Sequence, residues 1–429
     1  MSRNWEEDNQ NPGLKVLLGS AEEAGEKYVF ARKQQLLHMF LRLQLDMDGE
    51  ELTEQETALY DRQIRVWGAD AQRRLSKSHI LVSGLKGTVV EFCKNIVLAG
   101  VGSVTLNDDR LVTEELLSAN FLVPPDENVY SGKSLAELCC DSLTDFNPMV
   151  RVSVEKGEVS KFSADFFDKF DVVVISSCSL STKQSINEKC RKSLKRIAFY
   201  TVDCRDSCGE IFVDLQNYIY TKKKNDEAVE CLLEYSSFEV LEYSTEDNLL
   251  QTSIVLSDEK YGARENEMKE VCFVENRRSC LTSTQLGNLM YRNRAQPYIH
   301  WEAVSVPWRS LPRRVSKLYL AMRVIEKFEE LEGRIPGETS AADLPNVQKL
   351  RKELCEAQSL DESQIPDSLL ERLLEGRREF PPVCAVIGGI LGQEVIKAIS
   401  GKGDPLKNFF FFDAMDGKGI IEDIFRQKS

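Results

Sequence analysis

Histidine is scarce in this sequence, with His38, His79 and His300 the only ones among 429 residues. Because histidine is the commonest general base and a frequent metal ligand, its scarcity argues against Ser–His–Asp catalysis and against a metal-dependent hydrolase. Basic residues are also in deficit, since 55 lysines and arginines face 69 aspartates and glutamates and leave a net charge of −14. That balance disfavours a nucleic-acid partner and predicts basic surfaces on any protein partner.

Long hydrophobic runs are absent as well. The longest apolar stretch spans residues 381–392 and is broken by prolines and glycines, whereas a membrane-spanning helix needs about 20 apolar residues. The first residues are acidic, unlike the basic start of a secretory signal or a transit peptide. We therefore expect a soluble intracellular protein with no membrane partner.

The twelve cysteines lack the spacing of a disulfide framework or a zinc site. Cys204 and Cys208, for example, are one position further apart than the cysteines of a Cys-x-x-Cys pair. Free thiols in a reducing compartment and no metal site are therefore predicted. Cys384 is the best candidate for a nucleophilic cysteine, because it stands at the start of a predicted helix, where the dipole lowers a thiol pKa. Its apolar neighbours favour packing instead.

Short β-branched runs alternate with helical patterns from His79 onward, which is typical of βαβ units. Strands are expected at 80–82, 104–106, 150–154, 172–175 and 197–202, and helices at 88–98, 134–144 and 183–193. The alternation predicts an α/β fold with a mostly parallel sheet that is covered on both faces. Residues 211–215 are expected to form a further strand at a sheet edge.

The chain is predicted to have four parts. Residues 1–50 form an N-terminal extension, disordered or helical, and 51–239 form the first part of the α/β fold. Residues 240–301 form an irregular insertion, and 302–429 complete the fold. In this last part, helices are expected at 315–331, 344–357 and 383–400, followed by closing strands at 409–413 and 420–423.

The segment Ser83-Gly84-Leu85-Lys86-Gly87 falls between a predicted strand and a predicted helix, where a dinucleotide fold places its phosphate-binding glycines. Lys86 and Val89 stand where G-x-G-x-x-G has its second and third glycines, so this is a degenerate nucleotide pocket. A tight turn kept for packing is the favoured interpretation of Gly84 and Gly87. Asp108, which ends the next strand, either meets a ribose or caps its loop.

Five motifs spread along the chain belong together: Y-D-R-Q-I-R-V-W-G at 60–68, G-L-K-G at 84–87, D-F-N-P at 145–148, P-V-C-A-V-I-G-G-I-L at 382–391 and N-F-F-F-F-D at 408–413. In this combination the chain resembles the small subunits of heterodimeric SUMO-activating enzymes, plant versions above all. The resemblance covers residues 47–239 and 302–425. The segments 1–46 and 240–301 interrupt it and are interpreted as splicing or gene-model additions.

The resemblance implies a Rossmann-like adenylation fold of the ThiF type and a larger catalytic partner subunit. That partner would bind most of the ATP and Mg²⁺, adenylate SUMO and carry the thioester cysteine. When the pattern of adenylating relatives is laid over this chain, their arginine falls on Ala119 and their lysine on Leu135. Their aspartate is missing from residues 176–179. The resemblance therefore implies that this chain has no catalytic residues of its own.

Arg62 is the residue to which the resemblance assigns a role. The arginine of the D-R-Q motif in this family reaches across the heterodimer to the ATP bound by the partner, so Arg62 is expected to contact the nucleotide in trans. The plainer interpretation is that Arg62 and Arg65 are solvated charges that flank apolar residues of a helix.

Other functions remain open at this point. The regulatory subunit of the NEDD8-activating enzyme shares the D-R-Q beginning. A NAD-dependent oxidoreductase would use the same βαβ start, although Lys86 argues against it. A scaffold, or an isoform that its insertion disables, is a further alternative. The resemblance implies a nuclear location, with the cytoplasm as the alternative.

Overall fold

The structure is a computed structural model that describes residues 52–113, 117, 119–124, 126, 130, 132–224, 227–235, 315–334, 336–375 and 379–424. The predicted extension 1–50 and insertion 240–301 lie outside the described residues. The chain divides into two units, Met1–Arg74 and Leu75–Ser429. Each unit is described separately.

The first unit contains short helices that follow one another closely. They are α2 (Glu54–Leu59), α3 (Asp61–Trp67) and the beginning of α4 (Ala69–Lys77). Thr53 caps α2, because its hydroxyl accepts a hydrogen bond from the Glu56 amide and the Glu56 carboxylate accepts one from the Thr53 amide. Gly68 ends α3 with a φ of 88°, a backbone conformation that glycine adopts readily.

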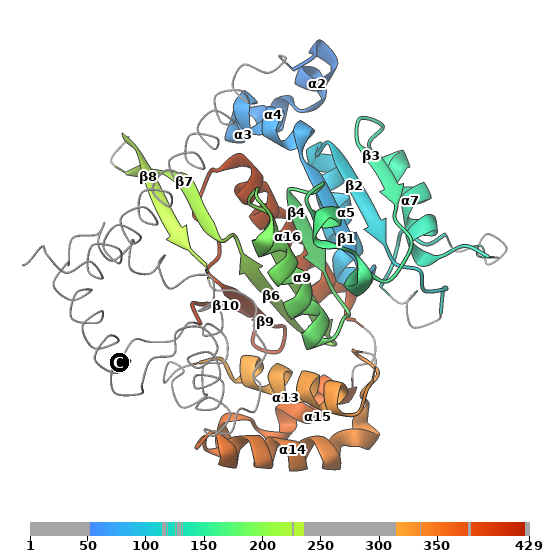
Figure 1. Cartoon of the computed structure of the whole chain (residues 1–429), viewed down its shortest axis with the longest axis vertical. Helices are drawn as coiled ribbons and strands as arrows, with labels where there is room; N and C mark the ends of the chain where they lie inside the picture. Colours follow the sequence, from blue (N-terminus) through green and yellow to red (C-terminus); the bar gives the residue numbers. More distant parts are fainter. Residues whose placement is uncertain are drawn as a thin grey trace, which may run out of the picture. The chain divides into compact units, whose positions relative to one another are not determined.

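The second unit is built on an eight-stranded sheet with the order β10-β9-β6-β5-β4-β1-β2-β3 (Figure 1). Its strands are β1 (His79–Ser83), β2 (Ser103–Asn107), β3 (Arg151–Val154), β4 (Val172–Ile175), β5 (Ala198–Arg205), β6 (Cys208–Asp214), β9 (Phe409–Asp413) and β10 (Lys418–Glu422). Strands β1 to β5 pair in parallel, and β6, β9 and β10 add an antiparallel side. The predicted α/β, Rossmann-like architecture with a mostly parallel sheet is thus confirmed.

The prediction that residues 211–215 form an edge strand is wrong. Strand β6 pairs with β5 on one side and with β9 on the other, where Ile211 lies opposite Phe410. The neighbour on that second side comes from the far end of the chain. A local hydrophobic pattern carries no information about a strand so distant in sequence, so the sheet extends past the expected edge.

Helices cover both faces of this sheet. They are α5 (Gly87–Ala99), α7 (Leu135–Phe146), α8 (Ala164–Phe167), α9 (Leu180–Lys192), α13 (Lys317–Leu331), α14 (Leu344–Ala357), α15 (Asp367–Glu375) and α16 (Pro381–Ser400). Short 3₁₀ turns lie at Val159–Lys161, Ala341–Asp343 and Glu362–Gln364, and β7 (Asn217–Lys224) and β8 (Glu227–Glu234) form a separate hairpin. Neither this hairpin nor α15 is among the elements predicted from the sequence.

Neighbouring residues of β5 show how the two faces are divided. Phe199 belongs to a buried apolar cluster with residues of α9, α13, α14 and α15. The Tyr200 hydroxyl points the other way and donates to the Glu394 carbonyl oxygen of α16 at 3.2 Å. Successive side chains of a strand face opposite sides, so α13 and α16 lie on opposite faces.

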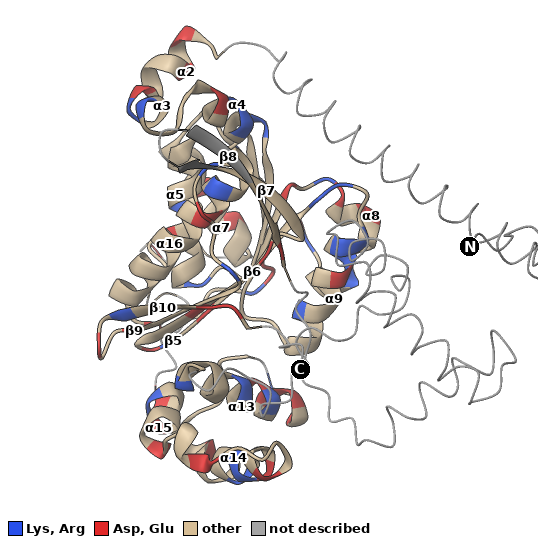
Figure 2. Ribbon diagram, turned by 90° about the vertical axis from the view of Figure 1, so that its left-hand side faces the viewer, with Lys and Arg blue, Asp and Glu red and all other residues tan. Residues whose placement is uncertain are grey.

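Helix α16 is strongly apolar and is tan along most of its length in the charge-coloured ribbon (Figure 2). By length and composition it could cross a membrane, but 61% of its apolar window is buried inside the protein. A single helix of this kind, mostly buried, is weak evidence for a membrane span and is equally typical of a core helix.

Gly388 sets how closely α16 approaches α5. A Cβ atom built on Gly388 would lie 2.7 Å from the Thr88 carbonyl oxygen and 2.9 Å from the Phe92 amide nitrogen, both in the backbone of α5. Among the described residues, a Cβ on the adjacent Gly389 would meet no atom within 4 Å. The two glycines therefore differ in packing although they share a helix.

We expect Gly388→Ala to lower the free energy of unfolding by about 1–3 kcal/mol, because the added methyl group forces the helices apart. Gly389→Ala, the matched control, should raise it by about 0.5–1 kcal/mol through the better helix propensity of alanine. Urea unfolding of both variants checks this, and equal changes in the two would contradict the close contact.

Candidate functional site

Gly84 makes the tight turn that follows β1. Its φ is +86°, and a Cβ atom there would lie 2.2 Å from the Ser176 carbonyl oxygen, at the end of the neighbouring strand β4. Only glycine fits this position. Gly87 is the first residue of α5, so the segment forms the predicted strand–turn–helix.

Asp108 lies beside this turn, and its carboxylate is already hydrogen-bonded within the chain. Its carboxylate accepts a hydrogen bond from the Leu85 amide at 2.8 Å and two from Arg110, from Nε at 2.9 Å and from a terminal guanidinium nitrogen at 2.6 Å. Asp108 is also buried. The alternative in which Asp108 stabilises its own loop is therefore the one that the geometry favours, and no oxygen is left for a ribose hydroxyl.

A carboxylate also fills the space in front of α5. Glu379 is buried, and its Oε2 accepts a hydrogen bond from the Thr88 amide, in the first turn of α5, at 3.2 Å. Burial raises the pKa of Glu379, while the positive charge of Lys86 opposes that rise. A Cβ atom on Gly87 would lie 2.9 Å from Glu379 Oε2 and 2.4 Å from the Ala119 Cβ. Glu379 and Ala119 thus close this part of the pocket.

The positions that carry charge in adenylating relatives are neutral here. Leu135 is buried at the first residue of α7, and Ala119 packs at Gly87. Residues 176–179 after β4 carry no carboxylate, and the Ser177 amide donates instead to Asp203 at 3.1 Å. Across the described ranges, no group of three or more His, Cys, Asp or Glu could hold a metal ion. The residues of this pocket do not fit ATP and Mg²⁺.

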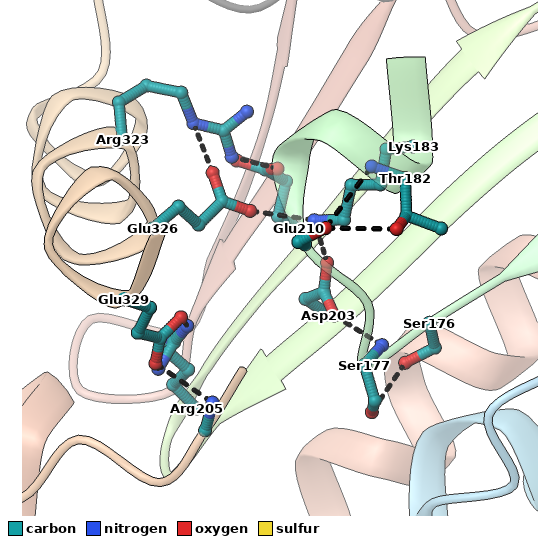
Figure 3. A network of polar contacts seen from close by, with 12 residues as sticks. Ser176, Ser177, Thr182, Lys183, Asp203, Arg205, Glu210, Arg323, Glu326 and Glu329 are labelled. Atoms are coloured by element: carbon teal, nitrogen blue, oxygen red, sulfur yellow. Dashed lines mark hydrogen bonds and ion pairs between the residues drawn. The ribbon is translucent and has the colours of Figure 1, made fainter. Parts of the chain in front are cut away.

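A buried ionic network lies next to the pocket, at the carboxyl end of β5 (Figure 3). Lys183 of α9, only 1% exposed, contacts Asp203 at 2.5 Å and Glu326 of α13 at 2.7 Å. Burial alone would lower the pKa of Lys183, but these two carboxylates together raise it above its ordinary value. The lysine therefore stays charged and links α9, β5 and α13.

The same network continues along α13 toward the sheet. Arg323 pairs with Glu210 of β6 and contacts Glu326 at 2.9 Å, and Arg205 binds Glu329 through two hydrogen bonds of 2.9 and 2.7 Å. The cavity that remains beside it has a volume of about 10 Å³. That is room for about one water molecule, so no small-molecule ligand fits there.

Arg62 belongs to the first unit and differs from its neighbour Arg65. Arg65 forms an ion pair with Asp61 at 2.9 Å, one helical turn earlier. The Arg62 side chain is exposed and, within the part of the chain that the structure describes, makes no hydrogen bond or ion pair. Its guanidinium is therefore available to a group outside the described residues.

Cys384 is buried in the first turn of α16, and its thiol lies 3.7 Å from Glu379 Oε2. Its place in the core agrees with packing rather than with a nucleophile. Cys204, on β5, is buried as well, and contact with Cys384 and loss of solvent raise its pKa well above the ordinary value.

Comparison with known proteins places the chain in a class. Residues 60–427 match the model of the ThiF family, so the chain belongs to the ThiF family.

Individual relatives within this family are subunits of SUMO-activating enzymes. SUMO-activating enzyme subunit 1B-1 of Arabidopsis thaliana is 62% identical over 378 residues, which cover 88% of this chain and 99% of that protein. Subunit 1A of the same plant is 61% identical with 88% and 98% coverage. SUMO-activating enzyme subunit 1 of Homo sapiens is 30% identical over 380 residues, with 87% and 96% coverage. These relatives confirm the predicted resemblance and favour it over the NEDD8 and NAD alternatives.

The structure brings Gly84, Gly87 and Asp108 close together at the turn after β1. The sequence analysis misses Glu379 and the network around Lys183. A glutamate two residues before a helix that starts with proline is a weak signal, and nothing local connects it to α5. Lys183 resembles any lysine of an amphipathic helix until its burial is known.

Replacing Lys183 tests the network. Lys183→Met leaves Asp203 without its lysine and leaves the buried Glu326 with Arg323 as its cation, so we expect the free energy of unfolding to fall by about 3 kcal/mol. Lys192→Met is the matched control on the same helix: this lysine is 72% exposed and lies 3.6 Å from Glu188, and its removal should change stability by about 0.5 kcal/mol or less. Chemical denaturation measures both, and similar losses would contradict a special role for Lys183.

Proposed function

We propose that this chain is the complementing subunit of a heterodimeric SUMO-activating enzyme. The proposal rests on its identity with SUMO-activating enzyme subunit 1 proteins over nearly their whole length. The catalytic partner subunit binds ATP and Mg²⁺, adenylates SUMO and forms the thioester. This chain supports that chemistry without a complete site of its own.

The filled pocket supports this division of work. Acyl adenylation needs cations that hold the triphosphate and a carboxylate that holds magnesium. In this chain Asp108 is taken by Arg110, and Glu379 lies at the start of α5. Both observations favour a subunit that acts on its partner's site.

Arg62 is the residue that we assign to the partner's site. A guanidinium that is not held by an ion pair within its own unit can form charge-assisted hydrogen bonds with a phosphate of the bound nucleotide. Such contacts in trans stabilise the negative charge that accumulates during phosphate chemistry. Asp61 supports the assignment indirectly, because it is paired with Arg65 and leaves Arg62 free to extend.

We expect Arg62→Ala to slow SUMO-dependent pyrophosphate exchange by the heterodimer about 100-fold or more. Arg65→Ala is the matched control, because it removes an equal charge three positions along the same helix. It should change the rate about twofold at most. Size-exclusion chromatography must show an intact heterodimer for both variants, and equal rates in both would refute the role of Arg62.

The first experiment on the proposal mixes the purified chain with the catalytic subunit, ATP, Mg²⁺ and SUMO. We expect pyrophosphate exchange in the mixture and none with either subunit alone. Co-elution without activity when NEDD8 replaces SUMO would strengthen the assignment. Activity of this chain alone, or the absence of co-elution, would contradict it.

A nuclear location is part of the proposal, and a fluorescent fusion of the full chain tests it.

The role of residues 240–301 is tested by comparing heterodimer formation with and without these residues. If only the shortened chain assembles, the insertion disables this isoform.

A further inference from the structure

The amino end of α5 is the place in a βαβ fold where a ligand phosphate is normally bound. Its first backbone N–H groups have no partner within the helix, and the helix dipole adds a partial positive charge there. In this chain Lys86 adds a full positive charge at the position just before the helix. Such a combination attracts an anion.

The chain supplies that anion itself. Glu379 Oε2 accepts from the Thr88 amide at 3.2 Å, and Oε1 lies 3.5 Å from the Thr88 hydroxyl. The Cys384 thiol approaches the same carboxylate, and Lys86 and Arg110 act on it electrostatically, as does the negatively charged Asp203. Among the described residues, Lys86 and Arg110 thus favour a carboxylate at this end of the helix, and Asp203 opposes it.

The backbone that follows Glu379 is fixed by two contacts. The following residue, Phe380, donates its amide to the Asp206 carbonyl oxygen at 3.3 Å, in the turn between β5 and β6. Pro381 then starts α16, which packs along α5. The residues that follow Glu379 are therefore tied to the sheet and to α16, which fixes the backbone on that side of the carboxylate.

We propose that Glu379 is a built-in substitute for a ligand phosphate and that it excludes phosphate-bearing molecules from this chain's own pocket. It occupies the volume next to Gly87 and repels a second anion. With the proposed function, it follows that the nucleotide is bound in the partner alone. The exclusion itself involves only residues of this chain, whichever modifier protein the enzyme activates.

A substitute anion and an ordinary helix cap are distinguished by what happens when the residue is removed. Loss of a cap lowers stability and does nothing more. Loss of a substitute anion leaves N–H donors, Lys86 and an open volume, which together bind a phosphate group. Binding of inorganic pyrophosphate, used as the probe, separates the two.

Equilibrium dialysis of the full chain against radiolabelled pyrophosphate provides the test. We expect saturable binding of one pyrophosphate per chain for Glu379→Ala and at least tenfold weaker binding for the unmodified chain. Pyrophosphate should also raise the melting temperature of Glu379→Ala alone. Glu375→Ala is the matched control, because it removes an exposed carboxylate at the end of α15, and it should behave like the unmodified chain.

A second variant covers the case in which Glu379→Ala does not fold. Glu379→Gln keeps the size of the side chain but removes its charge, so it should bind pyrophosphate measurably, and more weakly than the alanine variant. If the folded variants bind no more pyrophosphate than the unmodified chain, Glu379 is only a cap and the proposal is wrong. That result would leave the SUMO-activating function untouched, because no partner or activity enters the measurement.

Discussion

The buried contact of Lys183 with Asp203 and Glu326 joins two parts of the chain that are far apart in sequence. Charged groups are removed from water only when partners compensate them. Here the cation comes from α9 and one of the anions from α13, on the other side of residues 236–314. Neither part can bury its charge until the other is in place.

The same dependence recurs elsewhere in the second unit. Strand β6 gains its second neighbour only from β9, and the amino end of α5 is satisfied by a glutamate two residues before α16. The Gly388 contact brings α16 onto α5 at close range. The sheet at β6, the face of α5 that packs against α16, and the buried charge of Lys183 therefore all require the C-terminal part of the chain. Because these contacts join the two parts directly, the fold accommodates a long segment between them.

Local features were predictable from the sequence and long-range ones were not. The turn at Gly84, the end of α3 at Gly68 and the strands β1 to β5 follow from hydrophobic period and from glycine, since these depend on neighbouring residues. The interior place of β6 and the position of Glu379 depend on segments that meet only in three dimensions. The degenerate character of the pocket was visible in Lys86 and Ala119, but a missing charge in the sequence does not reveal which side chain fills the space.

The position of β9 between β6 and β10 also has a consequence for synthesis of the protein on the ribosome. Helix α16 and strand β9 are translated well after α5 and β6, so the nascent chain exposes one side of β6 and the apolar face of α5 until the later elements emerge. An unpaired strand edge and an uncovered helix face are what chaperones bind and what aggregates grow from. A premature stop codon anywhere before β9 therefore yields an aggregation-prone polypeptide rather than a smaller folded protein.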